Sequence, residues 1–134
     1  MNDIASLQAL LQPLFPGLIG IALTEAGPER VCASLKVRAE LCTVGGILHG
    51  GAVMAFADTL GAVATVVNLP PGVRTTTIES KTNFFAAAAV GSTVTAECTP
   101  FHKGKSTMVW QTQIKNEKGK LCAVVTQTQM VLSA

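Results

Sequence analysis

The chain contains no tyrosine and few other aromatic residues, with five phenylalanines and one tryptophan among 134 residues. Charged residues make up only 13% of the chain, and the formal net charge is +2. Proteins that bind nucleic acids use basic surfaces to hold phosphates and often aromatic side chains to stack bases. We therefore expect no nucleic-acid partner.

Metal-binding and export signals are also missing. The two histidines do not stand near a cysteine pair, and no C-x-x-C spacing occurs among the four cysteines, Cys32, Cys42, Cys98 and Cys122. This argues against a zinc site, and we expect no metal. The first residues, MNDIASLQALLQ, lack the basic segment of a signal peptide. We therefore expect a cytoplasmic protein with free thiols.

What the chain does have is apolar residues, which make up 49% of it. A length of 134 residues suits a single domain over residues 1–134 with a real core. With so few charges to cover its surface, the domain should hide part of it by self-association. We expect a homodimer or a homotetramer.

The hydrophobic pattern predicts two helices and five strands. Residues 3–14 have apolar side chains at helical spacing, and Pro13 and Pro16 end that helix. Residues 50–68 are apolar nearly all round and alanine-rich, which predicts one long helix wrapped by other elements. The predicted strands lie within 29–41, 75–85, 92–101, 106–116 and 121–132.

The last four of these strands are separated by the short turns AVGS, HKGK and NEKGK, which indicates an antiparallel meander. The fold class is therefore α+β, with an antiparallel sheet curled around one buried helix. The run from Ile47 to Val67 is a poor membrane span, because it contains Asp58 and three glycines and has no flanking basic residues. We expect no membrane partner.

Asp58 stands almost alone in this apolar run, and three interpretations are open. It could cap a second helix after a break, or be a buried carboxylate with a structural partner. It could instead be a catalytic carboxylate that is kept poorly solvated.

The sequence HGG, residues 49–51, precedes the predicted helix. Backbone N–H groups of Gly50 and Gly51 at a helix start could stabilise a developing oxyanion. The alternatives are a plain glycine turn and a packed His49. Gly50 and Asp58 are eight residues apart, roughly 12 Å along a helix. If both serve one reaction, they must come from different subunits.

Two further segments carry polar groups. In FHKGKST, Lys103, Gly104, Lys105 and Ser106 form either an ordinary solvated hairpin or a phosphate contact. In VRTTTIESKTNF, the threonines are ordinary strand residues, or Thr77 holds a water molecule. Arg74 could neutralise an acid or a phosphate of the substrate.

Together these motifs resemble one family. The pattern G-x-L-H-G-G at 46–51, the segment ADTLG at 57–61, T-x-x-x-x-x-N-F at 77–84, H-x-G-K-S at 102–106 and G-K-L-x-A-x-x-T-x-T at 119–128 are similar to the hotdog-fold acyl-CoA thioesterases. The branch that looks most alike is the phenylacetate-pathway type, related to one class of 4-hydroxybenzoyl-CoA thioesterase. The resemblance covers about residues 41–132.

The resemblance implies a role for each matching residue. Asp58 would be the nucleophile or the general base, Gly50 would polarise the thioester carbonyl through its N–H with His49 beside it, and Thr77 would position water or substrate. The segment 103–106 would contact coenzyme A, which enters as part of the substrate, so that no separate cofactor is expected. The family's subunits usually form dimers of dimers with active sites at the dimer interface.

Thr43 is a departure, because the family often has Asn or Gln six residues before the motif histidine. A hydroxyl at Thr43 can still donate and accept a hydrogen bond, but over a shorter reach. Two rival functions stay open: a hotdog dehydratase or hydratase with His49 as the base, and a non-catalytic acyl-CoA-binding protein. The acyl group itself is undetermined, and Arg74 slightly favours an acidic one.

Overall fold

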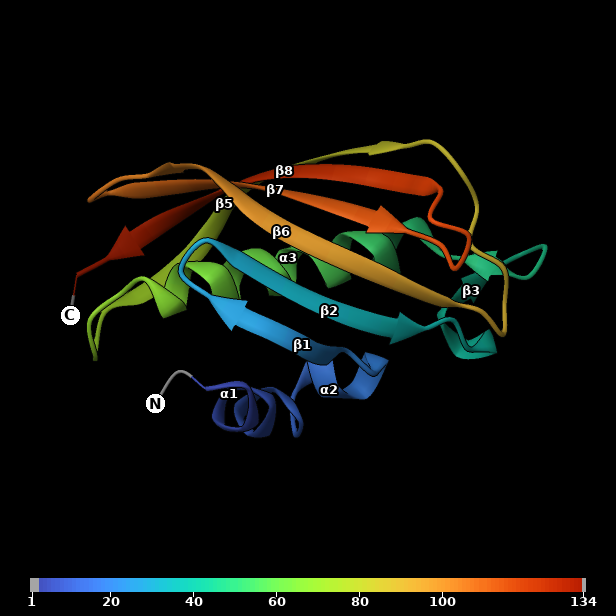
Figure 1. Cartoon of the computed structure of the whole chain (residues 1–134), viewed down its shortest axis with the longest axis horizontal. Helices are drawn as coiled ribbons and strands as arrows, with labels where there is room; N and C mark the ends of the chain where they lie inside the picture. Colours follow the sequence, from blue (N-terminus) through green and yellow to red (C-terminus); the bar gives the residue numbers. More distant parts are fainter. Residues whose placement is uncertain (1–2, 134) are drawn as a thin grey trace.

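A computed structural model describes residues 3–133 and shows a long helix held against a curved antiparallel sheet (Figure 1). The sheet strands are β1 (Ala22–Gly27), β2 (Arg30–Lys36), β5 (Arg74–Phe84), β6 (Thr93–Lys103), β7 (Thr107–Lys115) and β8 (Leu121–Leu132). The helices are α1 (Ile4–Leu11), α2 (Phe15–Ile19) and α3 (Gly50–Val67), with a 3₁₀ turn η1 (Ala39–Leu41). Two short strands, β3 (Cys42–Thr43) and β4 (Ile47–Leu48), pair ahead of α3.

The long central helix is confirmed. In α3, nine of 18 residues are buried, and its apolar side chains pack under the sheet with Phe56, Ala57 and Leu60 fully covered. Within residues 3–133, α3 is the one helix that is long and apolar enough to cross a membrane, with a mean hydropathy of 1.6, and half of it is buried inside the fold. A buried hydrogen bond from Trp110 Nε1 on β7 to Thr65 Oγ1 (2.8 Å) ties the helix to the sheet.

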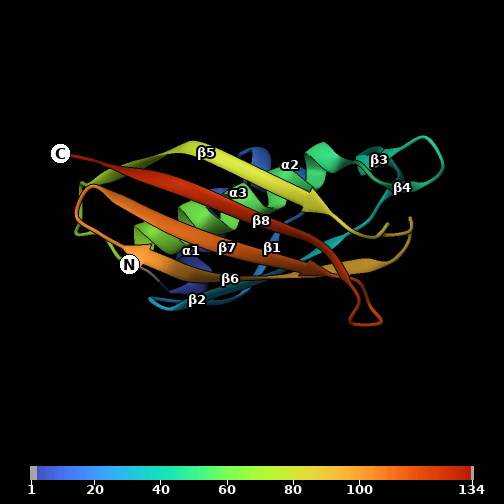
Figure 2. The same ribbon diagram turned by 90° about the horizontal axis from the view of Figure 1, so that it is seen from above.

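The strand order is β1-β2-β6-β7-β8-β5, so the predicted meander is right for β6, β7 and β8 and wrong for β5. β5 pairs with β8 at the edge of the sheet and not with β6 (Figure 2). The reason is that residues 85–92 do not form a tight turn. They cross the end of the sheet, where Val37 donates to the Ser92 carbonyl and Leu48 donates to the Ala88 carbonyl.

The N-terminal part departs from the sequence prediction in detail. The first helix is shorter than predicted, and Asp3 caps it by accepting from Ser6 N (2.8 Å). Helix α2 and the edge strand β1 were not predicted, and β2 ends at Lys36, short of the predicted residue 41, because the chain turns into η1. These differences leave the predicted α+β class and the hotdog fold, a sheet wrapped around one helix, confirmed.

Candidate active site

Asp58 lies in the middle of α3 and faces the sheet strands β5 and β8. One carboxylate oxygen, Oδ1, accepts a hydrogen bond from Thr77 Oγ1 on β5 (2.6 Å). Gln127 on β8 places its side-chain nitrogen 3.3 Å from the same oxygen. The other oxygen of Asp58 has no hydrogen-bond partner within residues 3–133. The carboxylate is therefore held on one side and available on the other.

Behind Thr77 lies a second glutamine, Gln129, and neither glutamine was predicted as a site residue. Gln129 Nε2 donates to Thr77 Oγ1 (2.5 Å), and Thr75 Oγ1 lies 2.9 Å from Gln129 Oε1. Gln127 and Gln129 are 1% and 0% exposed, on the strand face that otherwise buries Ala123 and Val125. The available signal was the pair of polar residues at positions 127 and 129, in phase with the apolar face of the predicted strand.

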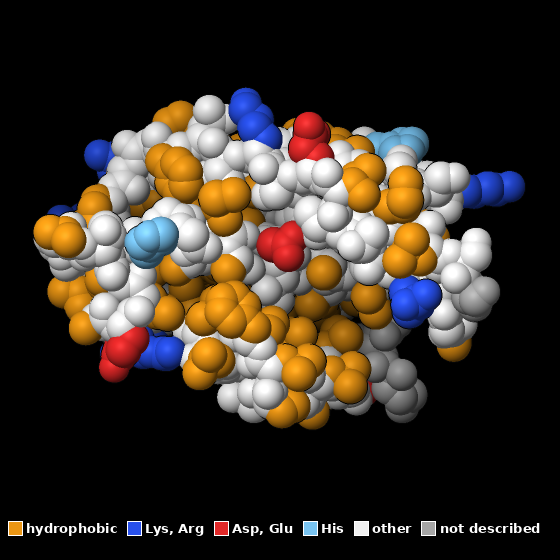
Figure 3. Space-filling view, turned by 180° about the vertical axis from the view of Figure 1, so that it is seen from behind, with side chains coloured by type: hydrophobic (Ala, Val, Ile, Leu, Met, Phe, Trp, Pro, Cys, Tyr) orange, Lys and Arg blue, Asp and Glu red, His pale blue; other side chains and the backbone are white. Residues whose placement is uncertain are grey.

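Asp58 is one of the residues that line an apolar cavity of about 300 Å³ between α1 and α3. Its other lining residues are Leu7, Leu10, Leu11, Pro16, Thr59, Ala62, Val63 and Val66. Figure 3 shows a face of the molecule that is rich in apolar side chains, with an isolated acidic group near its centre beside a hollow. A group that enters this cavity would meet the carboxylate in an otherwise aliphatic setting.

The start of α3 presents one unused backbone donor. His49 is the N-cap residue, and its Nδ1 accepts from Gly51 N (2.7 Å). The first N–H groups of a helix have no partner within the helix. Gly50 N, unlike Gly51 N, also finds no other acceptor among residues 3–133. Gly50 therefore offers a free N–H at the positive end of the helix dipole.

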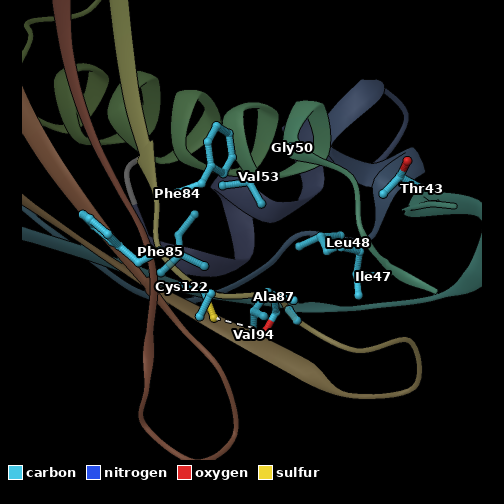
Figure 4. A pocket seen from close by; sticks show the side chains of 13 residues that line it. Thr43, Ile47, Leu48, Gly50, Val53, Phe84, Phe85, Ala87, Val94 and Cys122 are labelled. Atoms are coloured by element: carbon cyan, nitrogen blue, oxygen red, sulfur yellow. Dashed lines mark hydrogen bonds between the residues drawn. The ribbon is translucent and has the colours of Figure 1, made fainter. Parts of the chain in front are cut away.

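Gly50 lines a second cavity, of about 450 Å³, together with Thr43 (Figure 4). The ring of Phe84 lies against Gly50, since a Cβ built at Gly50 would come 3.2 Å from Phe84 Cζ. The remaining walls include Val53, Leu48 and other apolar residues, with Ala86, Ala87 and Ala88 along one side. Thr43 is exposed and contributes the only side-chain hydroxyl to this lining.

Within one chain, Gly50 and Asp58 line different cavities. They lie on the same continuous helix, about 12 Å apart along its axis. The structure thus brings together Asp58 with Thr77, and Gly50 with Thr43, but it does not bring these two groups to one point. His49 caps α3 and lines a separate cavity with Arg38 and Gly51.

Comparison with known proteins identifies the family. The model of the thioesterase superfamily matches residues 45–123, which is more than half of the chain. This chain belongs to the thioesterase superfamily.

Individual relatives agree with this assignment. The 1,4-dihydroxy-2-naphthoyl-CoA hydrolase of Escherichia coli is 29% identical over 127 residues, 95% of this chain and 93% of that protein. The proofreading thioesterase EntH of Cronobacter sakazakii is 31% identical over 78% of this chain and 75% of its own length. The crystal structure of a thioesterase from Haemophilus influenzae has a TM-score of 0.92, with 28% identity, covering 98% of this chain and 91% of that one. The resemblance to the hotdog thioesterases is confirmed, and the protein is a thioester hydrolase.

In this thioesterase, the predicted phosphate-binding turn lies at the far end of α3. Lys103 forms an ion pair with Glu29 and lies 3.5 Å from Asn68 Oδ1 at the helix C-cap. Gly104 and Lys105 line a cavity of about 430 Å³ with Asn68, Leu69, Pro70, Val73, Met108, Val131 and Ser133. Ser106 accepts a hydrogen bond from Val131 N through its carbonyl.

Arg74 begins β5 at the same end of the sheet, opposite Leu132, and its side chain is exposed. The basic residues that the sequence predicts to bind substrate therefore lie where α3 ends, about 15 Å along the helix from Asp58. Within residues 3–133, no group of three His, Cys, Asp or Glu side chains is arranged to hold a metal ion.

Proposed function

We propose that this thioesterase hydrolyses acyl-CoA thioesters with small, neutral acyl groups, at a site formed by two subunits. The observation that carries the proposal is the Asp58 carboxylate, which has one oxygen held by Thr77 and the other without a partner within residues 3–133, on a residue that lines an apolar cavity. A carboxylate in this position can attack the thioester carbonyl or remove a proton from attacking water.

The nature of the acyl group follows from the cavity beside Asp58. Its other lining residues carry no charge, and Leu7, Leu10 and Val63 provide aliphatic walls. A second carboxylate on the substrate would lose its hydration there and would face Asp58 without a cation. We therefore favour a neutral aliphatic or aryl acyl group over the acidic one that Arg74 suggested.

The free N–H of Gly50 would supply the oxyanion site. As the thioester carbon becomes tetrahedral, negative charge develops on its oxygen, and a helix N-terminus stabilises that charge. The coenzyme A thiolate then leaves, and the net reaction consumes one water to give the acid and the free thiol. His49 is an unsuitable base in this arrangement, because its Nδ1 already accepts from Gly51 N.

The edge strand β5 supports a shared site. Its 11 residues have one edge without a partner strand within residues 3–133, Ile78 and Phe84 on it are more than half exposed, and such edges readily pair with a second strand. Thr77 contacts Asp58, and Phe84 contacts Gly50. Antiparallel pairing of two β5 strands that is centred between Ser80 and Lys81 would set the Thr77 of one subunit opposite the Phe84 of the other. Asp58 would then lie near the Gly50 of the partner.

The basic end of the sheet would hold the coenzyme A phosphates. Lys105 and Arg74 have no ion-pair partner within residues 3–133, whereas the charge of Lys103 is already shared with Glu29. Replacing Lys103 and Lys105 together by alanine should raise KM for coenzyme A esters more than it lowers kcat, because they bind a part of the substrate remote from the reaction. An unchanged KM would remove the phosphate role.

The direct test is thiol release from a panel of acyl-CoA esters, comparing the wild type with Asp58→Asn. The panel should include short aliphatic, aryl, dicarboxylic and enoyl acyl groups. We expect turnover of neutral esters that collapses in the variant. Binding without thiol release, or enoyl hydration without thiol release, would refute the hydrolase proposal.

The oxyanion role can be tested with a matched pair of variants at Gly50. His49 has φ −63° and ψ 139°, a conformation allowed before proline, and proline is favoured at the first helical position. Gly50→Pro therefore removes the N–H and keeps the helix, while Gly50→Ala adds a Cβ and keeps the N–H. We expect kcat to fall about 100-fold or more with proline, and much less with alanine.

Subunit mixing tests the shared site. If Asp58 acts with the Gly50 of its partner, a heterodimer of Gly50→Pro and Asp58→Asn contains one intact site. Equal mixing makes half of the dimers heterodimers with half of their sites intact, so that roughly a quarter of wild-type activity should return. Two inactive parents that stay inactive after verified subunit exchange would place the site within one chain.

A further inference from the structure

The two buried glutamines of β8 have no explanation in packing alone. Gln127 and Gln129 are almost fully covered, and burying an amide is costly unless its polar atoms are paired. Their partners are not the backbone of the sheet but the side chains around Asp58. Both lie beyond residue 123, where the match to the family model ends.

The hydrogen bonds of the two glutamines and Thr77 are donated toward the carboxylate of Asp58. Gln129 Nε2 can only donate, so Thr77 Oγ1 accepts from it and keeps its own proton for Asp58 Oδ1. Thr75, 2.9 Å from Gln129 Oε1, contacts the opposite side of that amide. Gln127 Nε2 lies near both Oδ1 (3.3 Å) and the main-chain oxygen of Asp58 (3.4 Å). Every group that touches Oδ1 is thus a donor.

Gln127 can lie against helix α3 only because position 61 of the helix is a glycine. A Cβ at Gly61 would come within 2.2 Å of Gln127 Cδ. Gln127 therefore lies directly on the helix backbone, one turn from Asp58. Its Oε1 is buried with no partner within residues 3–133, a cost that packing alone does not explain.

We propose that Gln129, acting through Thr77, and Gln127, acting directly, are positioning residues that hold one oxygen of Asp58 and aim the other at the substrate. This inference rests on the proposed function for its kinetic consequence. An anion with two donors on one oxygen has a preferred rotamer, which fixes the direction of the second oxygen, and Asp58 is one of the residues that line the cavity beside α1.

The kinetic test uses Gln129→Met, which keeps the side-chain length and removes both polar atoms. We expect kcat to fall by about 2-fold to 10-fold, as for one hydrogen bond between neutral groups, with KM nearly unchanged. Gln111 lies on the outer face of the neighbouring strand β7, and Gln111→Met should leave both constants unaltered. An unchanged kcat in Gln129→Met would overturn the inference.

A double variant separates positioning from a general loss of structure. Because Gln129 acts through Thr77, the variant Thr77→Val with Gln129→Met should lose no more kcat than Thr77→Val alone. Thr77→Ser, which keeps the hydroxyl, should restore most of the activity. Losses that multiply would show that Gln129 does not act through Thr77 and would overturn the proposal.

If no acyl-CoA ester is hydrolysed, the contact between Gln129, Thr77 and Asp58 can be tested by NMR, which needs no turnover. In NMR spectra of the full chain, Asp58→Asn should shift the side-chain amide resonances of Gln129, which touches Asp58 only through Thr77. The same change should have no such effect in a Thr77→Val background, and the exposed control Asp3→Asn should have none in either. If the Gln129 resonances do not shift in Asp58→Asn, the inference is overturned. If the only negative result is that no thiol is released, only the proposed function is overturned.

Discussion

Replacement of Gly61 by alanine should change stability with a sign that depends on Gln127. In the wild type, the new Cβ would meet Gln127 Cδ at 2.2 Å and both terminal atoms at 2.4 Å, whereas carbon atoms normally approach to about 3.5 Å. Gln127 is 1% exposed and must move by about 1 Å or more in a closely packed interior.

Two opposing contributions set the size of the effect. Alanine in place of glycine favours the helix by about 1 kcal/mol. Overpacking costs about 1–3 kcal/mol, and the displaced Gln127 also loses its contact with Asp58, worth roughly 1 kcal/mol. The net result should be a loss of about 2 kcal/mol, or a Tm lower by roughly 6–10 °C for a chain of this length.

The assay is urea unfolding followed by circular dichroism at one fixed protein concentration, because self-association would otherwise change the midpoint. In a Gln127→Ala background the space is free, and Gly61→Ala should then stabilise the protein by about 1 kcal/mol. The two backgrounds form a double-mutant cycle with a coupling of about 3 kcal/mol. If Gly61→Ala stabilises the wild type as well, Gln127 does not lie on the helix at this position.

Three further outcomes are expected. Trp110→Phe removes the buried bond to Thr65 Oγ1 and should lower the free energy of unfolding by about 1–3 kcal/mol in urea titrations; an unchanged midpoint would contradict that bond. Burial raises the pKa of the Cys98 thiol from 9.0 to about 12, so the folded state holds the thiol proton more tightly than the unfolded state does. The free energy of unfolding therefore contains a contribution from Cys98 that is complete below pH 9 and is lost as the pH rises toward 12. Between pH 8 and 10.5 the wild type should therefore lose about 2 kcal/mol more than Cys98→Ala, and equal losses would refute the raised pKa. Glu29→Gln breaks an exposed ion pair with Lys103 and should change stability by less than about 1 kcal/mol, which the same titration measures.

The helices and strands that were predicted correctly are those with a clear periodic pattern of apolar residues or with tight turns at their ends. The apolar run ending at NLPPG defined α3 to within one residue, and tight turns defined β6, β7 and β8. The position of β5 could not be predicted in this way, because AVGS looks like a turn while residues 85–92 cross the sheet end. Both edge strands were thus beyond the local pattern, since β1 was missed and β5 was placed beside the wrong neighbour.

In the candidate site too, single residues could be predicted from the local sequence, whereas their contacts could not. Asp58, Gly50 and Thr77 could be selected because each has an unusual residue type for its local setting or belongs to a motif. That Thr77 touches Asp58 depends on a contact 19 residues apart, across the helix and an edge strand. Gln127 and Gln129 looked like ordinary strand residues, and their meaning depends on contacts 69 and 52 residues away.

The position of Asp58 in an apolar helix is thus explained by the strands that face it and not by its own neighbours in sequence. Helix α3 presents Asp58 to β5 and β8, and alternate residues of a strand share one face. Thr77 on β5, together with Gln127 and Gln129 on β8, supplies three polar side chains on those faces. Thr77 and Gln127 contact one carboxylate oxygen, and Gln129 contacts Thr77. The other carboxylate oxygen has no partner within residues 3–133. Asp58 is half-buried, and its second oxygen is not one of the buried polar atoms that lack a partner, so water or a substrate can reach it. The unequal treatment of the two oxygens is therefore the strongest structural argument for a reactive carboxylate.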